Sequence, residues 1–420
     1  MNLQAIKSLT FESDQNRGLL AIMDQLVVSG TNFLVIAMLG RYAGAEHLGR
    51  FTLGFSVVVI AVTAIRSLLM TPYAVYAQKE SHRRRDGMRG TVLIGCGILC
   101  TVATLIGIAV GFMLMRTEAS YGQFLVIVSL AIPAMTLREL GRQMSFADLR
   151  FARAVCYDAI ACTIYLVSIA WLILNDRLSA SSAMIALMIA TSFAGISWLV
   201  VNRTEFDFFS ETIREDISRY WSFGRWGAAG QASHVAQSYC VHWVLAIAGG
   251  VNATGLFAAV WSVVQLASPF VQGAGNALTP LLAKRLNDEG RDSLRHAILR
   301  CTQLALLAAA IYLLAIWLAG PFIMRTVFGS DFQDTEAITI WLGCSVALAT
   351  LGLAPTKVIS VLGFPHVNFS LNFLGLFVTA LLAGILGSFY GIEGTAIALM
   401  VAAMIGMIAK WGCYRSVMQR

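Results

Sequence analysis

Long apolar stretches separated by short polar breaks run along almost the whole chain. A transmembrane helix needs about 20 mostly apolar residues, because each residue rises about 1.5 Å through a hydrocarbon core of about 30 Å. An open strand edge cannot be satisfied in lipid, so every such stretch should be a helix. The pattern predicts twelve helices, near residues 18–40, 47–71, 90–115, 120–141, 155–175, 181–202, 224–249, 254–280, 298–324, 335–360, 366–388 and 392–413. The predicted fold is therefore an all-α polytopic membrane protein.

Composition and charge support a membrane protein. Hydrophobic residues make up 58% of the chain and charged residues only 13%, against about 25% charged in a soluble domain. The net charge is +7, yet most of the 30 Lys and Arg fall in alternate loops. The positive-inside rule explains this distribution and places both termini in the cytoplasm, so nucleic acid is not an expected partner. The run Arg83–Arg85 could also contact anionic membrane lipids.

The sequence repeats itself after a shift of 206 residues. At this shift several residues coincide over two spans: Gly18 with Gly224, Gln25 with Gln231, Gly49 with Gly255 and Phe51 with Phe257. Six spans per half is an even number, so both halves enter the membrane from the same side, which predicts two parallel six-helix lobes around a central cavity. The lobes would be residues 1–202 and 224–420. For the connecting residues 203–223, an amphipathic surface helix and a simple linker are both open.

Two charged residues lie more than one helical turn inside the predicted spans. Asp24 and Arg66 are each about six residues from the predicted cytoplasmic end, at similar depth on adjacent antiparallel helices. A charge at the bilayer centre costs roughly 2.5–3.5 kcal/mol on insertion scales, so each should face a cavity or a partner. One interpretation is an ion-coupling carboxylate beside an anion-binding arginine. The other is a structural ion pair that fixes helix packing.

Uncharged polar residues form stripes on the leading helices of both halves. The stripes are Gln25, Ser29 and Asn32 in the first span, Gly227, Gln231, His234, Ser238 and His242 in the seventh, and Gln265, Ser268, Gln272 and Asn276 in the eighth. Spacings of three and four keep each stripe on one helix face. We expect these faces to line a hydrated cavity, with hydrogen bonds between helices, worth about 0.6 kcal/mol each, as the alternative. The predicted cavity residues are Arg66, Gln25, Asn32, Gln231, His234, Gln265 and Gln272.

Two further arginines lie at predicted cytoplasmic ends of spans. Arg138 ends the fourth span and Arg225 opens the seventh. Both can snorkel to the interface as anchors. If they face inward with Arg66, they would instead make a positive cavity mouth that suits a phosphate or diphosphate. Nucleotide-binding, hydrolase and metal-binding motifs are absent from the sequence, so neither an enzyme nor a metal or bound cofactor is expected.

Several segments resemble a known transporter family. The segment DQLVVSGTNFLVIAMLGRYAGAEHLGRFTL, residues 24–53, resembles the opening of Wzx-like polysaccharide and O-antigen flippases, a branch of the MOP exporter superfamily. The matching features are the polar motif at residues 29–32, then Gly44, Gly49 and Phe51. Residues 142–155 resemble the family's basic link between the fourth and fifth spans, and residues 327–332 resemble its turn before the tenth span. Twelve spans fit this branch better than the fourteen-span lipid II flippases.

The resemblance implies a flippase in the bacterial cytoplasmic membrane with a MOP- or MATE-like fold. Its substrate would be an oligosaccharide linked to a polyprenyl diphosphate, moved from the inner to the outer leaflet by alternating access. H⁺ or Na⁺ would be the coupling ion, with Asp24 as the candidate coupling residue, and a polysaccharide polymerase and glycosyltransferases would be partners.

Two other functions stay open. A MATE-type multidrug or organic-cation antiporter would need an acidic cavity, and a non-transporting scaffold of polysaccharide assembly would not need the polar stripes.

Overall fold

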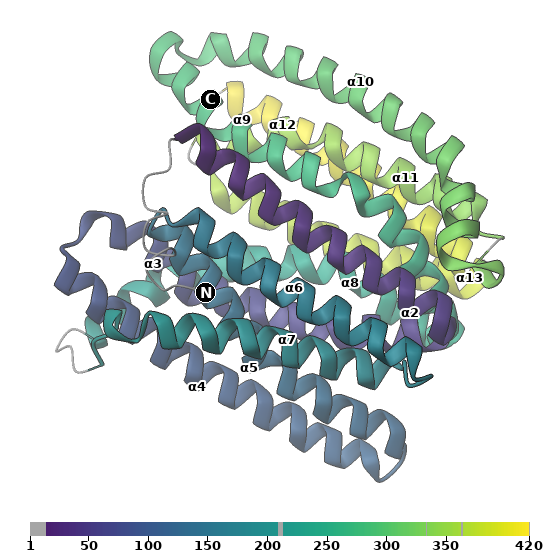
Figure 1. The fold of residues 1–420 in the computed structure, drawn as a ribbon. Coiled ribbons are helices and arrows are strands. Elements are labelled where there is room, and N and C mark those ends of the chain that lie inside the picture. The colour runs from purple at the N-terminus through teal and green to yellow at the C-terminus, as the bar shows by residue number, and fades with distance from the viewer. Residues whose placement is uncertain (1–13, 209–212, 333, 363, 420) are drawn as a thin grey trace. The chain divides into compact units, whose positions relative to one another are not determined.

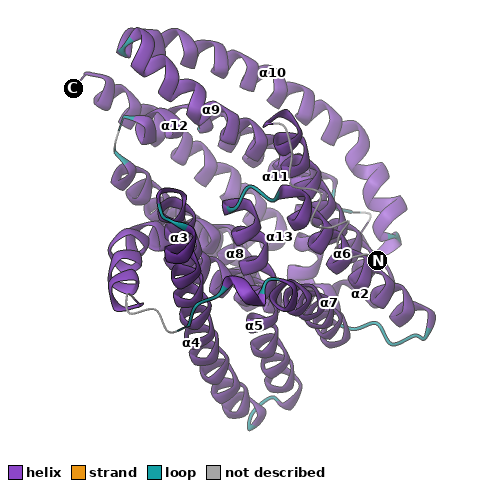
Figure 2. Ribbon diagram, turned by 60° about the vertical axis from the view of Figure 1, so that its left-hand side comes forward, coloured by secondary structure: helices purple, strands orange, loops and turns teal. Residues whose placement is uncertain are grey.

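The computed structural model describes residues 14–208, 213–332, 334–362 and 364–419, and these residues form helices and short connections without any strand (Figures 1 and 2). The α-helices are α2 (Asp14–Ile65), α3 (Thr71–Tyr76), α4 (His82–Met115), α5 (Ala119–Ala147), α6 (Phe151–Leu174), α7 (Ala180–Val201), α8 (Ile213–Val264), α9 (Ser268–Glu289), α10 (Arg291–Ile323), α11 (Glu336–Leu351), α12 (Leu353–Val361) and α13 (Pro365–Gln419). Within the described residues, nine helical segments are long and apolar enough to cross a membrane. The predicted all-α polytopic membrane fold is confirmed.

Three of these nine segments are long enough to cross twice. They contain 55, 47 and 53 residues, whereas one crossing needs about 20. Each contains one glycine with a non-helical backbone, namely Gly44 in α2, Gly250 in α8 and Gly391 in α13. These glycines fall between the predicted spans 1 and 2, 7 and 8, and 11 and 12. Each long segment therefore supplies two spans, and the nine segments account for the twelve predicted crossings.

Close contacts across these glycines show that the chain reverses there. The Thr254 hydroxyl donates to the carbonyl of His242 at 3.3 Å, although twelve residues of straight helix would separate them by about 18 Å. A Cβ placed on Gly394 would lie 2.1 Å from the Leu386 carbonyl oxygen. Gly44 and Gly250 have φ of 85° and 84° and ψ of 172° and 174°. Side chains disfavour such positive φ, which is why both reversals use glycine.

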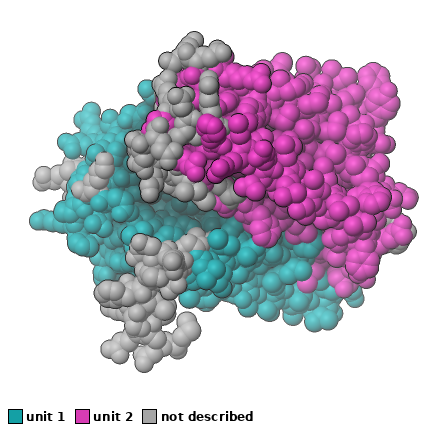
Figure 3. All heavy atoms as spheres, turned by 90° about the horizontal axis from the view of Figure 1, so that it is seen from above, with its two compact units in different colours: residues 1–35, 53–235 teal, residues 36–52, 236–420 magenta. Residues whose placement is uncertain are grey.

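The chain packs into two compact units that do not coincide with the two halves of the sequence (Figure 3). The first contains the described residues up to Val35 and Leu53–Val235, and the second contains Ile36–Thr52 and Ala236–Arg420. The tip of α2 thus belongs with the second unit, and the beginning of α8 with the first. The division into lobes at 1–202 and 224–420 stays a prediction. In the connecting segment 203–223, residues from Ile213 onward are part of α8, and residues 209–212 lie outside the described residues.

Close approaches at glycines hold the helices of the first unit together. A Cβ on Gly122 of α5 would lie 2.6 Å from the Gly111 carbonyl oxygen of α4, and one on Gly141 would lie 2.8 Å from the Trp198 ring of α7. Small residues allow this because association in lipid depends on van der Waals contact rather than on the hydrophobic effect. Helix α5 is therefore fixed between α4 and α7, and it carries the charged residues of the candidate site.

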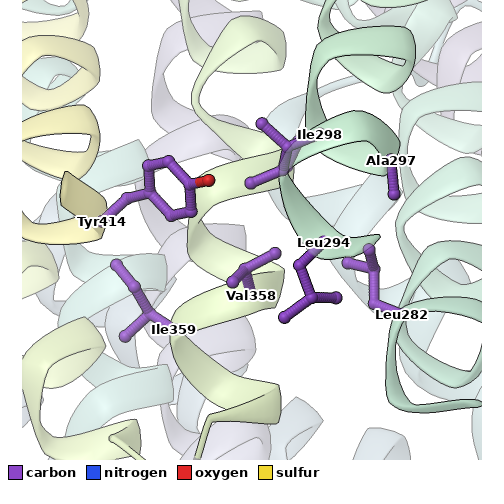
Figure 4. Packing of buried hydrophobic residues seen from close by; sticks show 8 residues of the cluster. Leu282, Leu294, Ala297, Ile298, Val358, Ile359 and Tyr414 are labelled. Carbon is purple, nitrogen blue, oxygen red and sulfur yellow. The ribbon is translucent and has the colours of Figure 1, made fainter. Parts of the chain in front are cut away.

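In the second unit, an apolar cluster joins α9, α10, α12 and α13 (Figure 4). Leu294, Val358 and Ile359 are completely buried, and Leu282 and Ile298 are nearly so. Together with the Tyr414 ring they fix one end of these helices.

The reversal loops of α2 and α8 meet in a reciprocal contact within the second unit. A Cβ on Gly49 would lie 2.0 Å from the Val251 carbonyl oxygen, and one on Gly255 would lie 1.7 Å from the Ala45 carbonyl oxygen. Gly49 and Gly255 are separated by 206 residues, as are Ala45 and Val251. The sequence repeat therefore extends to a contact in which each copy presents the same glycine to the same carbonyl of the other.

We expect Gly49→Ala and Gly255→Ala each to destabilise the protein by about 1–3 kcal/mol, the usual cost of overpacking. The opposing atom is a backbone carbonyl oxygen, which cannot rotate away from an added methyl group. Gly97→Ala is a matched control, because its added Cβ meets nothing within 4 Å. Thermal unfolding in detergent tests this, and melting of both variants at the control's temperature would contradict the contact.

Candidate functional site

A network of three arginines and three carboxylates lies inside the first unit. Its members are Asp24 of α2, Arg66 directly after α2, Arg138, Glu139 and Arg142 of α5, and Asp158 of α6. Asp24 is fully buried and Asp158 is 1% exposed. The formal charges cancel within the network, which is what burial of so many ionisable groups requires.

Arg142 is the centre of this network and connects α2, α5 and α6. Its guanidinium lies 2.7 Å from Asp24 Oδ2, 3.1 Å from Asp158 Oδ2 and 3.6 Å from Glu139 Oε2. Arg138 Nε donates to Asp158 Oδ1 at 2.7 Å. Hydrogen bonds between ionised partners are shorter and stronger than neutral ones, and the dry surroundings increase their strength.

Arg66 has the fewest partners of the three arginines. Its Nη1 donates to Glu139 Oε1 at 3.3 Å, and its side chain is 31% exposed. Glu139 has a second, closer donor, the amide of Gln143 at 2.8 Å. Arg66 begins a short π-helix, Arg66–Met70. Single π-helical turns within α-helices are frequent at functional sites.

The structure does not pair Asp24 with Arg66. Asp24 binds Arg142, and Arg66 binds Glu139. The two residues belong to one network but are linked only through α5. The pairing inferred from equal depth on adjacent helices was therefore wrong. Depth along two helices does not reveal that a third helix presents nearer partners to both.

The structure separates the two arginines predicted for the cavity mouth. Arg138 binds Asp158 and its side chain is only 13% exposed, so it is part of the network rather than an interfacial anchor. Arg225 is exposed on α8. Arg66 and Arg138 are thus brought together, and the joint mouth with Arg225 stays a prediction.

The polar stripe of the first span is connected to the charged network. Gln25 is half-buried, donates to Ser29 at 3.2 Å and accepts from Arg142 at 3.5 Å. Asn32 is half-buried on the same helix.

The stripes of the seventh and eighth spans are more exposed. Gln231 and His234 are exposed on α8, Gln272 is exposed on α9, and Gln265 is half-buried in the turn between them. The side chain of Asn276 lies outside the described residues. Whether these residues line a cavity stays a prediction. His242 differs from the rest of its stripe because its side chain is buried. The Phe257 ring packs edge-on against the His242 imidazole, with 5.1 Å between the two ring centroids.

A second cluster of charges joins the ends of several helices around Arg89 of α4. Arg89 lies 2.7 Å from Asp148, 3.0 Å from Asp86 and 3.0 Å from Glu205. It also donates to the Tyr73 hydroxyl at 3.0 Å. These partners come from α3, α4 and the segments after α5 and α7. Arg89 therefore fixes connections between helices, a role that its position in a basic loop did not suggest.

Sequence reasoning missed Arg142 as the central residue. The sequence analysis placed Arg142 in the basic link of residues 142–155, left Arg138 open between an interfacial anchor and a cavity mouth, and did not single out Asp158. One signal was available: Arg138, Glu139 and Arg142 have the i, i+1 and i+4 spacing that clusters charges on one region of a helix. In the described part of the chain, no three His, Cys, Asp or Glu side chains form a metal site.

Comparisons with solved structures identify the fold. The chain is similar to a multidrug resistance MATE family transporter of the MOP superfamily in an inward-facing conformation, with a TM-score of 0.78 and 17% identity over 94% of each chain. It is similar to the lipid II flippase MurJ in an inward closed conformation, with a TM-score of 0.73 and 12% identity over 94% of this chain and 87% of that one. For a MOP superfamily transporter from Pyrococcus furiosus, the TM-score is 0.67 and the identity 15% over 99% of each chain.

No protein-family model and no curated protein sequence matches the chain. The identities to solved structures are low, so the likeness establishes the fold and leaves the Wzx-like branch a prediction. The chain thus has the all-helical, multi-pass membrane fold of MOP superfamily transporters.

Proposed function

We propose that the protein is a flippase that moves a polyprenyl-diphosphate-linked oligosaccharide from the inner to the outer leaflet of a bacterial cytoplasmic membrane, with both termini cytoplasmic. The observation that carries this proposal is the set of half-buried arginines on the membrane-spanning segments of a transporter fold. One structural neighbour is itself named a lipid II flippase. An anionic lipid-linked substrate accounts for arginines in a region where an exporter of organic cations would keep unpaired acids.

Arg66 is the arginine best placed to exchange its partner for a substrate. Its single ion pair at 3.3 Å and its partial exposure leave guanidinium N–H groups for an incoming anion. The membrane potential also favours this direction of transport, because moving a negative charge outward gains about 2.3 kcal/mol per 100 mV. Arg138 and Arg142 are held by carboxylates and would act mainly by keeping the network in place.

The same network supplies a group for coupling to H⁺ or Na⁺. Asp24 Oδ1 is buried and has no hydrogen-bond partner, and Asp24 shares Arg142 with Asp158. A proton or sodium ion at Asp24 would satisfy this oxygen. It would also change the net charge of the network by one unit, so ion binding at Asp24 would be coupled to the binding of an anion.

The second candidate function is a MATE-type multidrug or organic-cation antiporter, which the structural similarity to MATE transporters favours. Proteoliposomes distinguish the two. Outward movement of a labelled polyprenyl-diphosphate oligosaccharide supports the flippase, whereas export of a cationic dye without lipid movement supports the antiporter. Glycosyltransferase and polysaccharide polymerase genes beside the gene of this protein would support the lipid-linked oligosaccharide as its substrate.

We expect Arg66→Ala to lower lipid-linked oligosaccharide export at least tenfold, because the variant loses a charge-assisted contact worth roughly 1.5–3 kcal/mol. Abundance in the membrane should stay unchanged, since Glu139 keeps Gln143 and Arg142 as partners. Arg203→Ala, at an exposed position outside the network, is the control. Wild-type export by Arg66→Ala would remove Arg66 from the mechanism.

We expect Asp24→Asn to make export independent of the pH or sodium gradient, because the amide cannot take up the ion. Transport would be measured in proteoliposomes with and without each imposed gradient. Asp176→Asn provides an isosteric control at an exposed turn. If Asp24→Asn kept the wild-type dependence on the gradient, its role would be structural only.

A further inference from the structure

The first turns of α8 are attached to α4 by a buried ion pair within the first unit. Asp216 lies in the first turn of α8 and is completely buried. Both of its carboxylate oxygens accept hydrogen bonds from the Arg84 guanidinium of α4, one of them at 2.8 Å. Bidentate pairing adds geometric specificity as well as energy, and the amino end of a helix favours a negative charge. The beginning of α8 is therefore held in one position on the first unit.

Arg219, about one turn further along α8, reinforces this attachment. Its guanidinium carbon lies 4.1 Å from the centre of the Tyr76 ring in α3, and its Nη1 lies 3.4 Å from Glu80 Oε1. A cation over an aromatic face is attracted by the ring. Tyr76 also packs against the Phe223 ring of α8, with 5.6 Å between the ring centroids. The attachment thus extends along α8 as far as Phe223.

The next residue of α8, Gly224, lies against the backbone of the π-helix Arg66–Met70. A Cβ placed on Gly224 would lie 2.7 Å from the Leu68 carbonyl oxygen, 3.0 Å from Leu68 Cα and 3.0 Å from the Ser67 carbonyl oxygen. Ser67 and Leu68 directly follow Arg66 in this π-helix. The glycine therefore lets α8 support the short turn from which the Arg66 side chain extends.

The geometry of this turn decides where Arg66 points. The Thr71 amide donates to the Arg66 carbonyl, which is the i, i+5 bond of a π-helix. Conversion of the turn to α-helix would rotate the residues on its two sides relative to each other by about 100°, the angle of one α-helical residue. The Arg66 guanidinium, 3.3 Å from Glu139 in the structure, would then lose this position.

We propose that Asp216 and Gly224 are positioning residues for Arg66. Asp216 anchors the beginning of α8, and Gly224 transmits that position to the backbone of the π-helix, which holds the Arg66 guanidinium where an anionic substrate group can reach it. The proposal rests on the proposed function, in which Arg66 receives the diphosphate of the lipid-linked substrate. Neither residue touches the substrate. The segment that connects the two halves of the sequence thereby acquires a role in substrate binding.

Binding of polyprenyl diphosphate to the purified full-length protein in lipid nanodiscs tests this role. We expect Gly224→Ala to weaken binding about tenfold, as the loss of one charge-assisted contact would. Asp216→Asn should weaken it about threefold, because an amide still accepts a hydrogen bond from Arg84 but carries no charge. Gly97→Ala is a matched control whose added methyl meets nothing within 4 Å, and Glu215→Gln removes an exposed carboxylate beside Asp216. Wild-type binding by Gly224→Ala would overturn the proposal.

A double-mutant cycle with Arg66 separates positioning from general damage to the fold. If Gly224 acts through Arg66, Gly224→Ala should have no further effect on binding in an Arg66→Ala background. An equal loss in both backgrounds would overturn the proposal. If Gly224→Ala does not accumulate in the membrane, Arg219→Gln provides the same cycle, because it removes contacts of an exposed side chain on the attached face of α8.

Hydrogen exchange at the amides of residues 66–70 tests the positioning without a ligand. We expect exchange about tenfold faster in Gly224→Ala than in wild type, and unchanged in Gly97→Ala, because the added methyl displaces the π-helix. If exchange is faster but the wild type binds no polyprenyl diphosphate, the positioning stands and the proposed function fails. If the wild type binds this lipid through Arg66 but Gly224→Ala binds and exchanges like the wild type, the function stands and the positioning fails.

Discussion

Lipid offers no hydrogen-bond partner to a backbone amide and no counterion to a charge, and the rest of this structure depends on that constraint. Every described crossing is a helix because only a helix satisfies its own backbone. The chain reverses at Gly44, Gly250 and Gly391, where a side chain would disfavour the required conformation. Inside the helices, each arginine of the first unit's network is held by a carboxylate. Asp24 Oδ1 departs from this rule, because it is buried without a hydrogen-bond partner among the described residues.

The two halves of the sequence share a scaffold but differ in their chemistry. Gly44 and Gly49 of the first hairpin recur as Gly250 and Gly255 in the second, with the same backbone conformation and a reciprocal contact. The charges do not recur, because positions 206 residues beyond Asp24, Arg66 and Arg142 hold Gly230, Gln272 and Leu348. The repeat therefore preserves residues that packing requires, while the ionisable groups are specific to each half.

The charged residues of the candidate site differ in whether the sequence alone identifies them. Asp24 and Arg66 were visible in the sequence because charges inside apolar spans are costly. Arg142 was not, since its position near the end of a span made a loop assignment equally reasonable. For Arg138 the sequence left an interfacial anchor and a cavity mouth both open, and only the packing of α5 against α6 pairs it with Asp158.

The sequence by itself determined the helices, the number of crossings, the reversal points and the repeat. Those properties follow from hydropathy and glycine positions over a few tens of residues, because burial in lipid selects helices of a set length. The tertiary structure alone decided which charges neutralise one another. Asp24 and Arg142 are 118 residues apart, as their hydrogen bond records, and no local pattern relates two residues at that separation. Their pairing depends on which helices lie side by side, and in lipid that depends on close contacts at small residues, such as those of Gly122 and Gly141 that hold α5 against α4 and α7.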